Sequence, residues 1–266
     1  MTLEARYETL AIETPEPHVA VVRLNRPEVS NALNTQMGLD LLAVWTALIA
    51  DPGDVRCVVL TAAGEKAFCG GGDLKQRNGM TDAQWQHQHE IFERAYWALH
   101  DCPVPVIAAV NGHAYAGGLE LMLSCDFAYA VRTARFALTE VTIGIMPGGT
   151  GTVNLPRAVG ERRAKEIILT GKPFTADQAY EWGLLNRICE PGAVMDAALD
   201  TARTVAANAP LSVRQAKKSI HWGLQMDQRT AFRFEIEAYN RLVPTEDRLE
   251  GVRSFNEKRK PVFRGR

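Results

Sequence analysis

The sequence predicts an α/β fold that continues into a C-terminal α-helical region. Two observations predict the α/β part: near-continuous apolar runs recur up to about residue 175, and longer stretches with helical periodicity separate them. Such runs are typical of strands that are buried on both faces, in a sheet covered by helices. The third observation is that the strand pattern nearly vanishes beyond about residue 175, whereas the helical pattern continues.

The first elements expected along the chain are two strands and a helix. Residues 7–13 and 18–24 are short runs rich in β-forming side chains, and Pro15 and Pro17 separate them, which predicts a strand pair or hairpin. Apolar side chains then recur at helical spacing from about residue 36 to 50, and the Asp-Pro-Gly-Asp segment that follows ends this helix.

Strands and helices are then expected to alternate. Apolar runs mark the strands, and apolar residues at helical spacing mark the helices. The expected strands lie within residues 55–62, 102–112 and 125–131, and the expected helices cover residues 82–100, 117–125 and 161–170.

The last third of the chain is expected to be helical. Its four helical stretches lie at about 175–182, 193–208, 211–223 and 227–256, with a break in the last near Pro244. The change of pattern places one domain boundary near residue 205. It divides the chain into a core, residues 1–205, that holds the active site, and a helical region, residues 206–266.

The composition narrows the class of protein. The 266 residues are 46% hydrophobic and 23% charged, which is typical of a globular protein with a sizeable core. A formal charge of -1 creates no global field for nucleic acid or an anionic membrane. Five scattered cysteines without a Cys-x-x-Cys pair argue against a disulfide framework or a zinc site. With no basic segment before an apolar run at the N-terminus, we expect a cytoplasmic protein without a membrane span.

Two glycine clusters are candidates for an oxyanion site. Gly72 is the last glycine of the segment FCGGGD, which follows a strand-like run, and Gly117 begins the expected helix 117–125. A glycine at such an end leaves its N–H free and lets a ligand approach the backbone closely. If the two clusters converge, the two N–H groups can bind a carbonyl oxygen that becomes an oxyanion. The alternative is that both clusters are only tight turns.

Two isolated carboxylates are candidates for proton transfer. Glu120 follows Gly117 by three residues and has apolar neighbours, and Glu140 lies in the apolar segment FALTEVTIGIM. Burial raises the pKa of a carboxyl group toward the range that a catalytic acid or base needs. The alternatives are a helix cap for Glu120 and a solvent-facing loop residue for Glu140.

Six blocks of the sequence resemble, in order and spacing, the enoyl-CoA hydratase/isomerase (crotonase) superfamily, hydratase branch. They are RPEVSNAL, KAFCGGGDL, PVIAAVNGHAYAGGLELMLSCDFAYA, FALTEVTIGIMPGGTG, LTGKPFTADQAYEWGLLNRI and GVRSFNEKRKPVF. The resemblance covers residues 7–263. It implies a crotonase-like spiral of ββα units, a C-terminal helical region that assembles the chain as a homotrimer or homohexamer, acyl-CoA substrates, and no metal or redox cofactor.

The resemblance also implies roles for individual residues. Gly72 and Gly117 correspond to the two oxyanion donors, Glu120 to the base that activates water for attack on Cβ, and Glu140 to the acid that protonates Cα. The implied substrate-binding residues are Ala32, Leu33, Gly70, Gly71, Asp73, Leu74, Lys75 and Lys258. In relatives the position of Lys258 reaches a CoA phosphate, often on a neighbouring subunit. By themselves, Lys75 is typical of a solvated charge and Lys258 of an ordinary basic tail.

The expected activity is that of an enoyl-CoA hydratase, which reversibly adds water to a trans-2-enoyl-CoA to give a 3-hydroxyacyl-CoA. The alternatives are an enoyl-CoA double-bond isomerase, which needs one base and no activated water, and a non-catalytic or RNA-binding family member. Ala116 stands where many relatives have a further glycine, and Leu138-Thr139 where Gln-Pro is common. Both departures are modest. The second adjoins the acyl pocket implied by the resemblance, so it leaves the identity of the acyl group open more than the chemistry. Met80, Trp85 and Ile145 are candidates to line that pocket.

Overall fold

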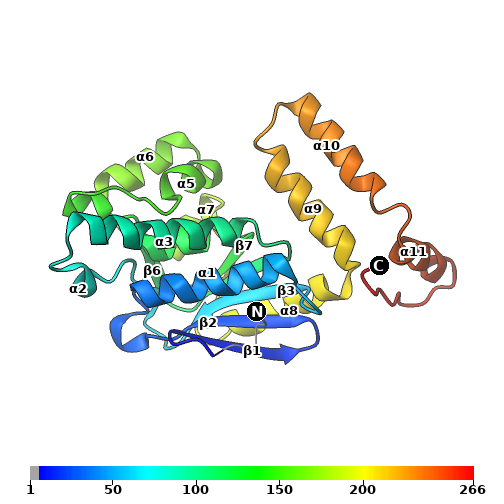
Figure 1. Ribbon diagram of the computed structural model, residues 1–266, viewed down its shortest axis with the longest axis horizontal. Helices are drawn as coiled ribbons and strands as arrows, with labels where there is room; N and C mark the ends of the chain where they lie inside the picture. The colour runs from blue at the N-terminus through cyan, green and yellow to red at the C-terminus, as the bar shows by residue number, and fades with distance from the viewer. Residues whose placement is uncertain (1–5) are drawn as a thin grey trace.

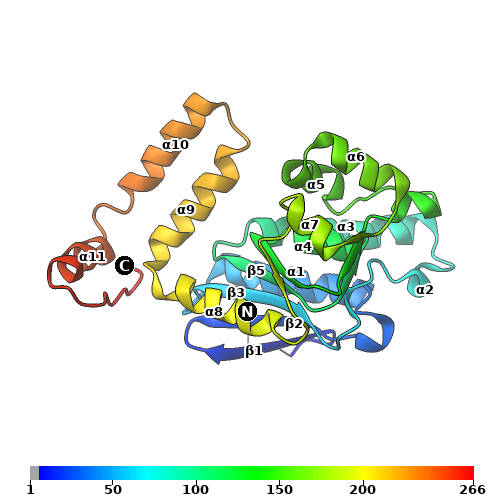
Figure 2. The ribbon, with the colours of Figure 1, turned by 180° about the vertical axis from the view of Figure 1, so that it is seen from behind.

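Two sheets organise the structure, a computed structural model that describes residues 6–266. Residues 1–5 lie outside the described residues. Two sequence predictions fall on them: that they belong to the core of residues 1–205, and that the N-terminus carries no targeting segment. The larger sheet has six strands in the order β1-β2-β3-β5-β7-β10 (Figures 1 and 2). They are β1 (Leu10–Glu16), β2 (Val19–Leu24), β3 (Cys57–Ala62), β5 (Val106–Val110), β7 (Phe127–Val131) and β10 (Arg187–Cys189). β1 and β2 form the predicted antiparallel pair, and all other neighbours in this sheet are parallel.

The first strand differs from its prediction, because Pro15 lies inside β1 and not between the two strands. β1 is the edge strand of the sheet, and its pairing with β2 is irregular between Glu13 and Glu16. A proline has no N–H to donate, so it is tolerated at an edge or an irregularity of this kind.

The smaller sheet has four strands in the order β4-β6-β8-β9. They are β4 (Ala67–Cys69), β6 (His113–Tyr115), β8 (Arg135–Ala137) and β9 (Phe174–Thr175). The first three are parallel, and β9 is antiparallel to β8. Runs of two or three residues are too short to show an apolar period, so the sequence pattern does not predict them as strands.

Successive strands alternate between the two sheets. β3, β5 and β7 belong to the larger sheet, and the strands that follow each of them, β4, β6 and β8, belong to the smaller one. A helix completes each unit: α3 (Asp82–His100) after β4, α4 (Gly117–Leu123) after β6, and α5 (Gly151–Val159) after β8. The chain is therefore a spiral of ββα units, which confirms the fold class that the resemblance implies.

The other helices of the core lie close to their expected positions. α1 (Thr35–Ala50) and α3 run side by side and pack against each other (Figure 1). α3 begins at the predicted residue because Thr81 and Gln84 form a capping box around its first turn. The remaining elements are η1 (Pro27–Val29), α2 (Leu74–Arg77), η2 (Glu140–Ile143), α6 (Glu161–Thr170) and α7 (Ala176–Glu181).

The C-terminal helices leave the body of the molecule after α8 (Val194–Ala207), which packs on strands of the larger sheet. α9 (Pro210–Gly223), α10 (Gln228–Asn240) and α11 (Glu246–Asn256) project away from both sheets (Figures 1 and 2). The interruption between α10 and α11 contains Pro244, as predicted. The domain boundary near residue 205 stays a prediction, although the chain changes direction close to it.

Two further expectations concern the interior and the membrane. β3 and β5 are buried along their whole length, as predicted for strands covered on both faces. All five cysteines are free thiols. Within residues 6–266, no helix is both long enough and apolar enough to cross a membrane.

Two ββα units pack backbone against backbone where α4 meets β4. A Cβ atom added to Gly118 would lie 2.7 Å from the carbonyl carbon of Cys69 and still closer to its carbonyl oxygen. These are strand backbone atoms, which cannot move aside without disturbing the pairing of β4 with β6. Gly118 therefore lets the first turn of α4 lie directly against the end of β4.

We expect Gly118→Ala to destabilise the protein by roughly 3 kcal/mol or more, because a methyl group there overlaps the backbone of Cys69. Gly223→Ala is the matched control, since Gly223 also lies in a helix but its added Cβ would meet only the Cβ of Ala231, at 3.7 Å. This control should change stability by less than about 1 kcal/mol. Urea denaturation of both variants measures the difference, and equal costs would contradict the packing argument.

Candidate active site

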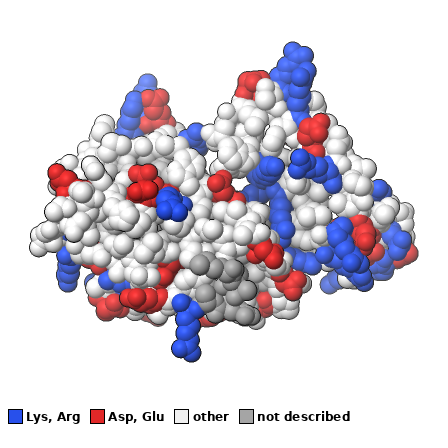
Figure 3. All heavy atoms as spheres, viewed as in Figure 1, with Lys and Arg blue, Asp and Glu red and all other residues white. Residues whose placement is uncertain are grey.

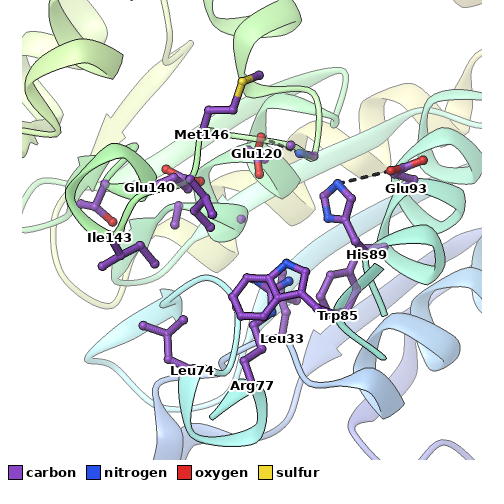
Figure 4. A pocket seen from close by; sticks show the side chains of 18 of the residues that line it. Leu33, Leu74, Arg77, Trp85, His89, Glu93, Glu120, Glu140, Ile143 and Met146 are labelled. Atoms are coloured by element: carbon purple, nitrogen blue, oxygen red, sulfur yellow. Dashed lines mark hydrogen bonds and ion pairs between the residues drawn. The ribbon is translucent and has the colours of Figure 1, made fainter. Parts of the chain in front are cut away.

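A cavity of about 620 Å³ lies where α3, α4, η2 and the loop after β4 meet (Figure 4). Most of its wall is apolar, with the side chains of Leu33, Trp85, Phe92, Ile143, Ile145 and Met146. The charged or titratable side chains in the wall are Arg77, His89, Glu93, Glu120 and Glu140, with Tyr96 beside them. An apolar pocket with a few convergent polar groups is the usual form of a small-molecule site.

The two predicted glycine clusters converge at this cavity. β4 and β6 are parallel neighbours, so the loops that follow them start side by side. A Cβ atom added to Gly71 would lie 2.7 Å from the Cβ of Ala116 and 3.3 Å from the backbone nitrogen of Gly117. The loop containing Gly72 therefore lies directly against the turn that begins α4, and both Gly72 and Gly117 line the cavity.

The N–H groups of these two glycines are available to a ligand. In the bridge between Leu33 and Gly72, the Leu33 N–H donates to Gly71 O at 2.8 Å and the Asp73 N–H donates to Leu33 O at 2.9 Å. The N–H of Gly72 takes no part in this bridge. Within residues 6–266, neither this group nor the N–H of Gly117, the first residue of α4, has a hydrogen-bond acceptor.

The turn before Gly117 is strained. Ala116 has a φ of 50°, a region that residues with a Cβ rarely occupy. Its N–H donates to Ala137 O at 2.8 Å, and its own carbonyl accepts from the N–H groups of Leu119 and Glu120, at 2.9 and 3.1 Å. Strain of this kind costs of order 1–3 kcal/mol and persists only where the surroundings enforce it. These three hydrogen bonds hold the turn that presents the Gly117 N–H.

Glu120 is buried and is held by the loop before α5. Its Oε1 accepts the N–H groups of Gly149 and Gly151, each at 2.8 Å. A Cβ atom on either glycine would lie 2.8 Å from a carboxylate oxygen of Glu120, so side chains are excluded at both positions. Thr150 between them has a φ of 86°, unusual for a β-branched residue. The strained loop thus directs two N–H donors at one carboxylate oxygen. The alternative that Glu120 caps its own helix is therefore wrong, because these bonds go to another segment of the chain.

Glu140 is buried at the start of η2 and reaches the same cavity. Its Oε2 is buried and has no hydrogen-bond partner within the described part of the chain. The alternative of a solvent-facing loop residue is therefore wrong. A buried carboxylate oxygen without a partner is costly, and it is a group that a bound water or substrate can satisfy.

The pKa values of both carboxyl groups are raised. Burial, and next the charge of Glu140, raise the pKa of Glu120 to about 7 against the opposing hydrogen bonds from Gly151 and Gly149. Burial also raises the pKa of Glu140. Each carboxyl group therefore keeps its proton to a higher pH than an exposed glutamate does.

Tyr96 supports the site from α3. Its hydroxyl donates to the carbonyl oxygen of Gly117 at 2.7 Å. Burial, and next the charge of Glu120, raise the pKa of Tyr96 well above its ordinary value, so the hydroxyl keeps its proton. The bond anchors the carbonyl group of Gly117, in the peptide that directly follows the N–H facing the cavity.

The predicted site residues are only partly brought together. Those that line the cavity are Leu33, Gly70, Gly72, Leu74, Gly117, Glu120 and Glu140, and Trp85 and Ile145 join them as the apolar candidates. Those that do not line it are Ala32, Gly71, Asp73, Lys75, Lys258 and Met80. The catalytic and substrate-binding roles of all these residues, whether or not they line the cavity, stay predictions.

Asp73 has a structural environment that explains its burial. It caps α2 by accepting the N–H groups of Lys75 and Gln76, and it forms an ion pair with Arg26 at 3.0 Å. Lys258 follows α11, which lies at the opposite end of the molecule from α2 (Figures 1 and 2). Within one chain, Lys258 is therefore remote from the cavity.

Sequence reasoning missed several residues of the wall, above all Arg77, Phe92 and Tyr96. Gly149 and Gly151 were also missed as partners of Glu120. Their segment, PGGTG, belongs to a block that carries the resemblance. The repeated glycines beside Glu140 are the signal that could have identified them.

No group of three or more His, Cys, Asp or Glu side chains within residues 6–266 is arranged to hold a metal ion. The absence of a metal or redox cofactor stays a prediction.

Comparison with known proteins gives consistent matches over nearly the whole chain. The family model described as enoyl-CoA hydratase/isomerase matches residues 14–266. A short-chain-enoyl-CoA hydratase of Clostridium acetobutylicum is 39% identical over 245 residues, 92% of this chain and 94% of the relative. An (E)-benzylidenesuccinyl-CoA hydratase of Thauera aromatica is 39% identical over 253 residues, 93% of this chain and 96% of the relative. The crystal structure of an enoyl-CoA hydratase from Bacillus anthracis is similar with a TM-score of 0.95 and 40% identity, over 97% of this chain and 100% of that one.

We expect Glu120 to make stability depend on pH. Because its pKa rises from an ordinary 4.5 to about 7 on folding, the folded state binds this proton more tightly. The resulting stabilisation is complete below the unfolded-state pKa and is lost as pH rises through about 7. Relative to Glu120→Gln, the free energy of unfolding of the parent should fall by roughly 1–3 kcal/mol between pH 5 and 8.

Urea denaturation across this pH range measures the effect. Glu181→Gln, a substitution of an exposed residue at the end of α7, is the control and should show no such trend. A constant difference between the parent and Glu120→Gln would show that the pKa of Glu120 is not raised.

Proposed function

The chain belongs to the enoyl-CoA hydratase/isomerase family, and on this basis we propose that it is an enoyl-CoA hydratase that adds water reversibly to a trans-2-enoyl-CoA. The observation that carries the proposal is that two buried glutamates and two free backbone N–H groups face one cavity. The hydratase names of relatives at 39% identity support the same reaction. Coenzyme A enters as part of the substrate, and the proposed steps need no other cofactor.

In the proposed mechanism, the thioester carbonyl oxygen lies between the N–H groups of Gly72 and Gly117. When water adds to Cβ, the electrons of the double bond move toward this oxygen, which gains enolate charge. Donors that are already in place stabilise this charge without reorganisation, and each is worth about 2.7–4 kcal/mol of barrier. The bond from Tyr96 to Gly117 O supports the position of the second donor.

Proton transfer is assigned to the glutamate pair. Glu120 takes a proton from the water as its oxygen bonds to Cβ, and Glu140 delivers a proton to Cα as the enolate collapses. Glu120 thus ends with one proton more and Glu140 with one fewer, and exchange with solvent restores the pair. The two backbone donors on Glu120 favour its ionised form and oppose the burial that raises its pKa to about 7, so Glu120 is available as the base when pH exceeds this value. Burial raises the pKa of Glu140 and leaves its Oε2 without a partner, which suits it to deliver a proton.

The pair also supports hydration over double-bond isomerisation. An isomerase moves one proton between two carbons and needs a single base with no activated water. Here both carboxyl groups are buried in the same wall, and both have raised pKa values. Two groups of opposite protonation state are what the addition of a water requires.

We expect Glu120→Gln and Glu140→Gln each to lower kcat for crotonyl-CoA hydration by roughly 10²-fold or more, because glutamine keeps the shape but cannot exchange a proton. The double variant should lose much less than the product of the two effects, since the pair acts as a unit. Glu181→Gln should hydrate at the parental rate.

The same kinetic assay separates the alternatives. An isomerase would show one severe and one mild substitution, together with faster conversion of a 3-enoyl-CoA than hydration in the parent. Near-parental hydration by both single variants would contradict the assignment of the glutamate pair.

We further propose that the chain assembles as a trimer or a pair of trimers through its C-terminal helices. α9, α10 and α11 expose large apolar side chains, and Phe255 is 83% exposed. Apolar surface of this kind usually marks an interface. On the face in Figure 3, charges of both signs are interspersed, and Lys and Arg side chains gather around the C-terminal helices. This basic end supports the prediction that Lys258 meets a CoA phosphate in a neighbouring subunit.

Sedimentation equilibrium at micromolar concentration should find three or six chains per particle. Phe255→Asp should shift this distribution toward the monomer, because it places a charge in the proposed interface. Lys258→Ala should raise KM for crotonyl-CoA about tenfold through loss of a phosphate contact, whereas Lys260→Ala in the same tail should leave KM unchanged. An active monomeric parent would overturn both the assembly and the role of Lys258.

A further inference from the structure

Arg77, the last residue of α2, is a charged group in the cavity without a counterion. It is half-buried and lines the wall, yet it forms no ion pair with any carboxylate of residues 6–266. Its guanidinium lies over the ring of Trp85, 4.3 Å from the centroid, and 5.6 Å from that of Phe92 (Figure 4). Burial lowers the pKa of Arg77, as expected for a cation that has lost water without gaining an anion.

The guanidinium is held in place by a buried amide. Arg77 Nε donates to Gln88 Oε1 at 2.8 Å, and Gln88 is almost fully buried in α3. The amide nitrogen of Gln88 donates in turn to Thr35 Oγ1 and Gln76 Oε1, each at 2.8 Å. This bonding uses only Nε. Within the described residues, Nη1 and Nη2 have no acceptor, so the forked end of the side chain is free to bind a ligand.

The position of Arg77 relative to the oxyanion donors indicates which part of a substrate it meets. A Cβ atom added to Gly72 would lie 3.1 Å from Arg77 Nη1, so the guanidinium is next to the proposed thioester site. The phosphates of CoA are separated from the thioester by the whole pantetheine arm. A group beside Gly72 is therefore out of reach of these phosphates, and Arg77 shares the apolar wall, with Trp85 and Ile145, that is the candidate lining for the acyl part of the substrate.

We propose that Arg77 makes the cavity selective for 2-enoyl-CoA thioesters whose acyl chain carries a carboxylate, which the two Nη groups bind. The inference rests on the proposed hydratase function and names the substrate class of the same site. Arginine binds a carboxylate through two parallel hydrogen bonds, and the aromatic rings of Trp85 and Phe92 exclude water from the pair. The apolar wall then contacts the remaining carbon atoms of the acyl group.

The test compares two substrates of matched shape. Glutaconyl-CoA carries a terminal carboxylate, and 5-methylhex-2-enoyl-CoA replaces it with an isopropyl group of similar size. The parent should hydrate glutaconyl-CoA with a kcat/KM about tenfold or more above that of the neutral substrate. Arg77→Met should lower this ratio by roughly 30-fold or more, as when one partner of a desolvated charge pair is removed.

The variants separate charge, geometry and fold. Arg77→Lys keeps the charge but loses the planar fork, so it should retain part of the preference. Arg94→Met makes the same change at an exposed position of α3 and should leave the ratio at the parental value. Thermal unfolding of each variant checks that the fold is intact.

Binding provides a readout that does not depend on catalysis. Calorimetry should give tighter binding of glutaryl-CoA than of 5-methylhexanoyl-CoA to the parent, and Arg77→Met should abolish this difference. One outcome is that the parent hydrates crotonyl-CoA while Arg77→Met changes neither the kcat/KM ratio nor the binding ratio of the carboxylate and neutral thioesters. In that case Arg77 is structural, and the inference fails while the proposed hydratase function stands. If crotonyl-CoA is not hydrated at all, the proposed function fails, and the calorimetric ratio still decides whether Arg77 recognises a carboxylate.

Discussion

The site depends on one backbone contact, between the end of β4 and the first turn of α4. At Gly118 the helix lies against the carbonyl group of Cys69 with no room for a side chain. At Gly71 the loop that follows β4 lies against Ala116, the residue before α4. Two N–H groups from different ββα units therefore face one cavity. The parallel pairing of β4 with β6 provides the approach, and the absence of two side chains makes it close enough.

Several unfavourable features that reduce the stability of the folded state lie around this contact. Ala116 and Thr150 are held at positive φ, two carboxyl groups are buried close enough to interact, and one oxygen of Glu140 has no partner in the described chain. Each of these features is local, and the fully buried strands β3 and β5 lie in the other sheet. A well-packed scaffold can support strain and desolvated charge that would unfold a marginal one.

The sequence predicted the parts of the fold and site whose signals are local. Both ends of helix α3 were predicted correctly, because its apolar periodicity and its capping residues lie in one continuous stretch of the sequence. Glu120 and Glu140 were identified because a lone carboxylate among apolar residues is visible without a structure. The strands of the smaller sheet were missed, because three residues cannot show a period.

The missed site residues have a different cause. Arg77 lies in the segment LKQRNGM, which is polar and typical of a solvated loop, and its burial comes from Trp85 and Gln88 on the next helix. The partners of Glu120 could not be assigned either, since hydrogen bonds from Gly149 and Gly151 span about thirty positions of the chain.

The alternation of strands between two sheets has an evolutionary consequence. Each turn of the spiral adds its own loop to the cavity, so the oxyanion donors, the glutamates and the wall formed by α2 and the start of α3 are carried by separable segments. Substitutions or insertions between residues 74 and 85 can remodel the wall while the reacting groups keep their supports. Proteins with this fold can therefore change the acyl group that they accept through a few substitutions in the wall. The oxyanion donors and the glutamates, which require several segments to be positioned together, are kept.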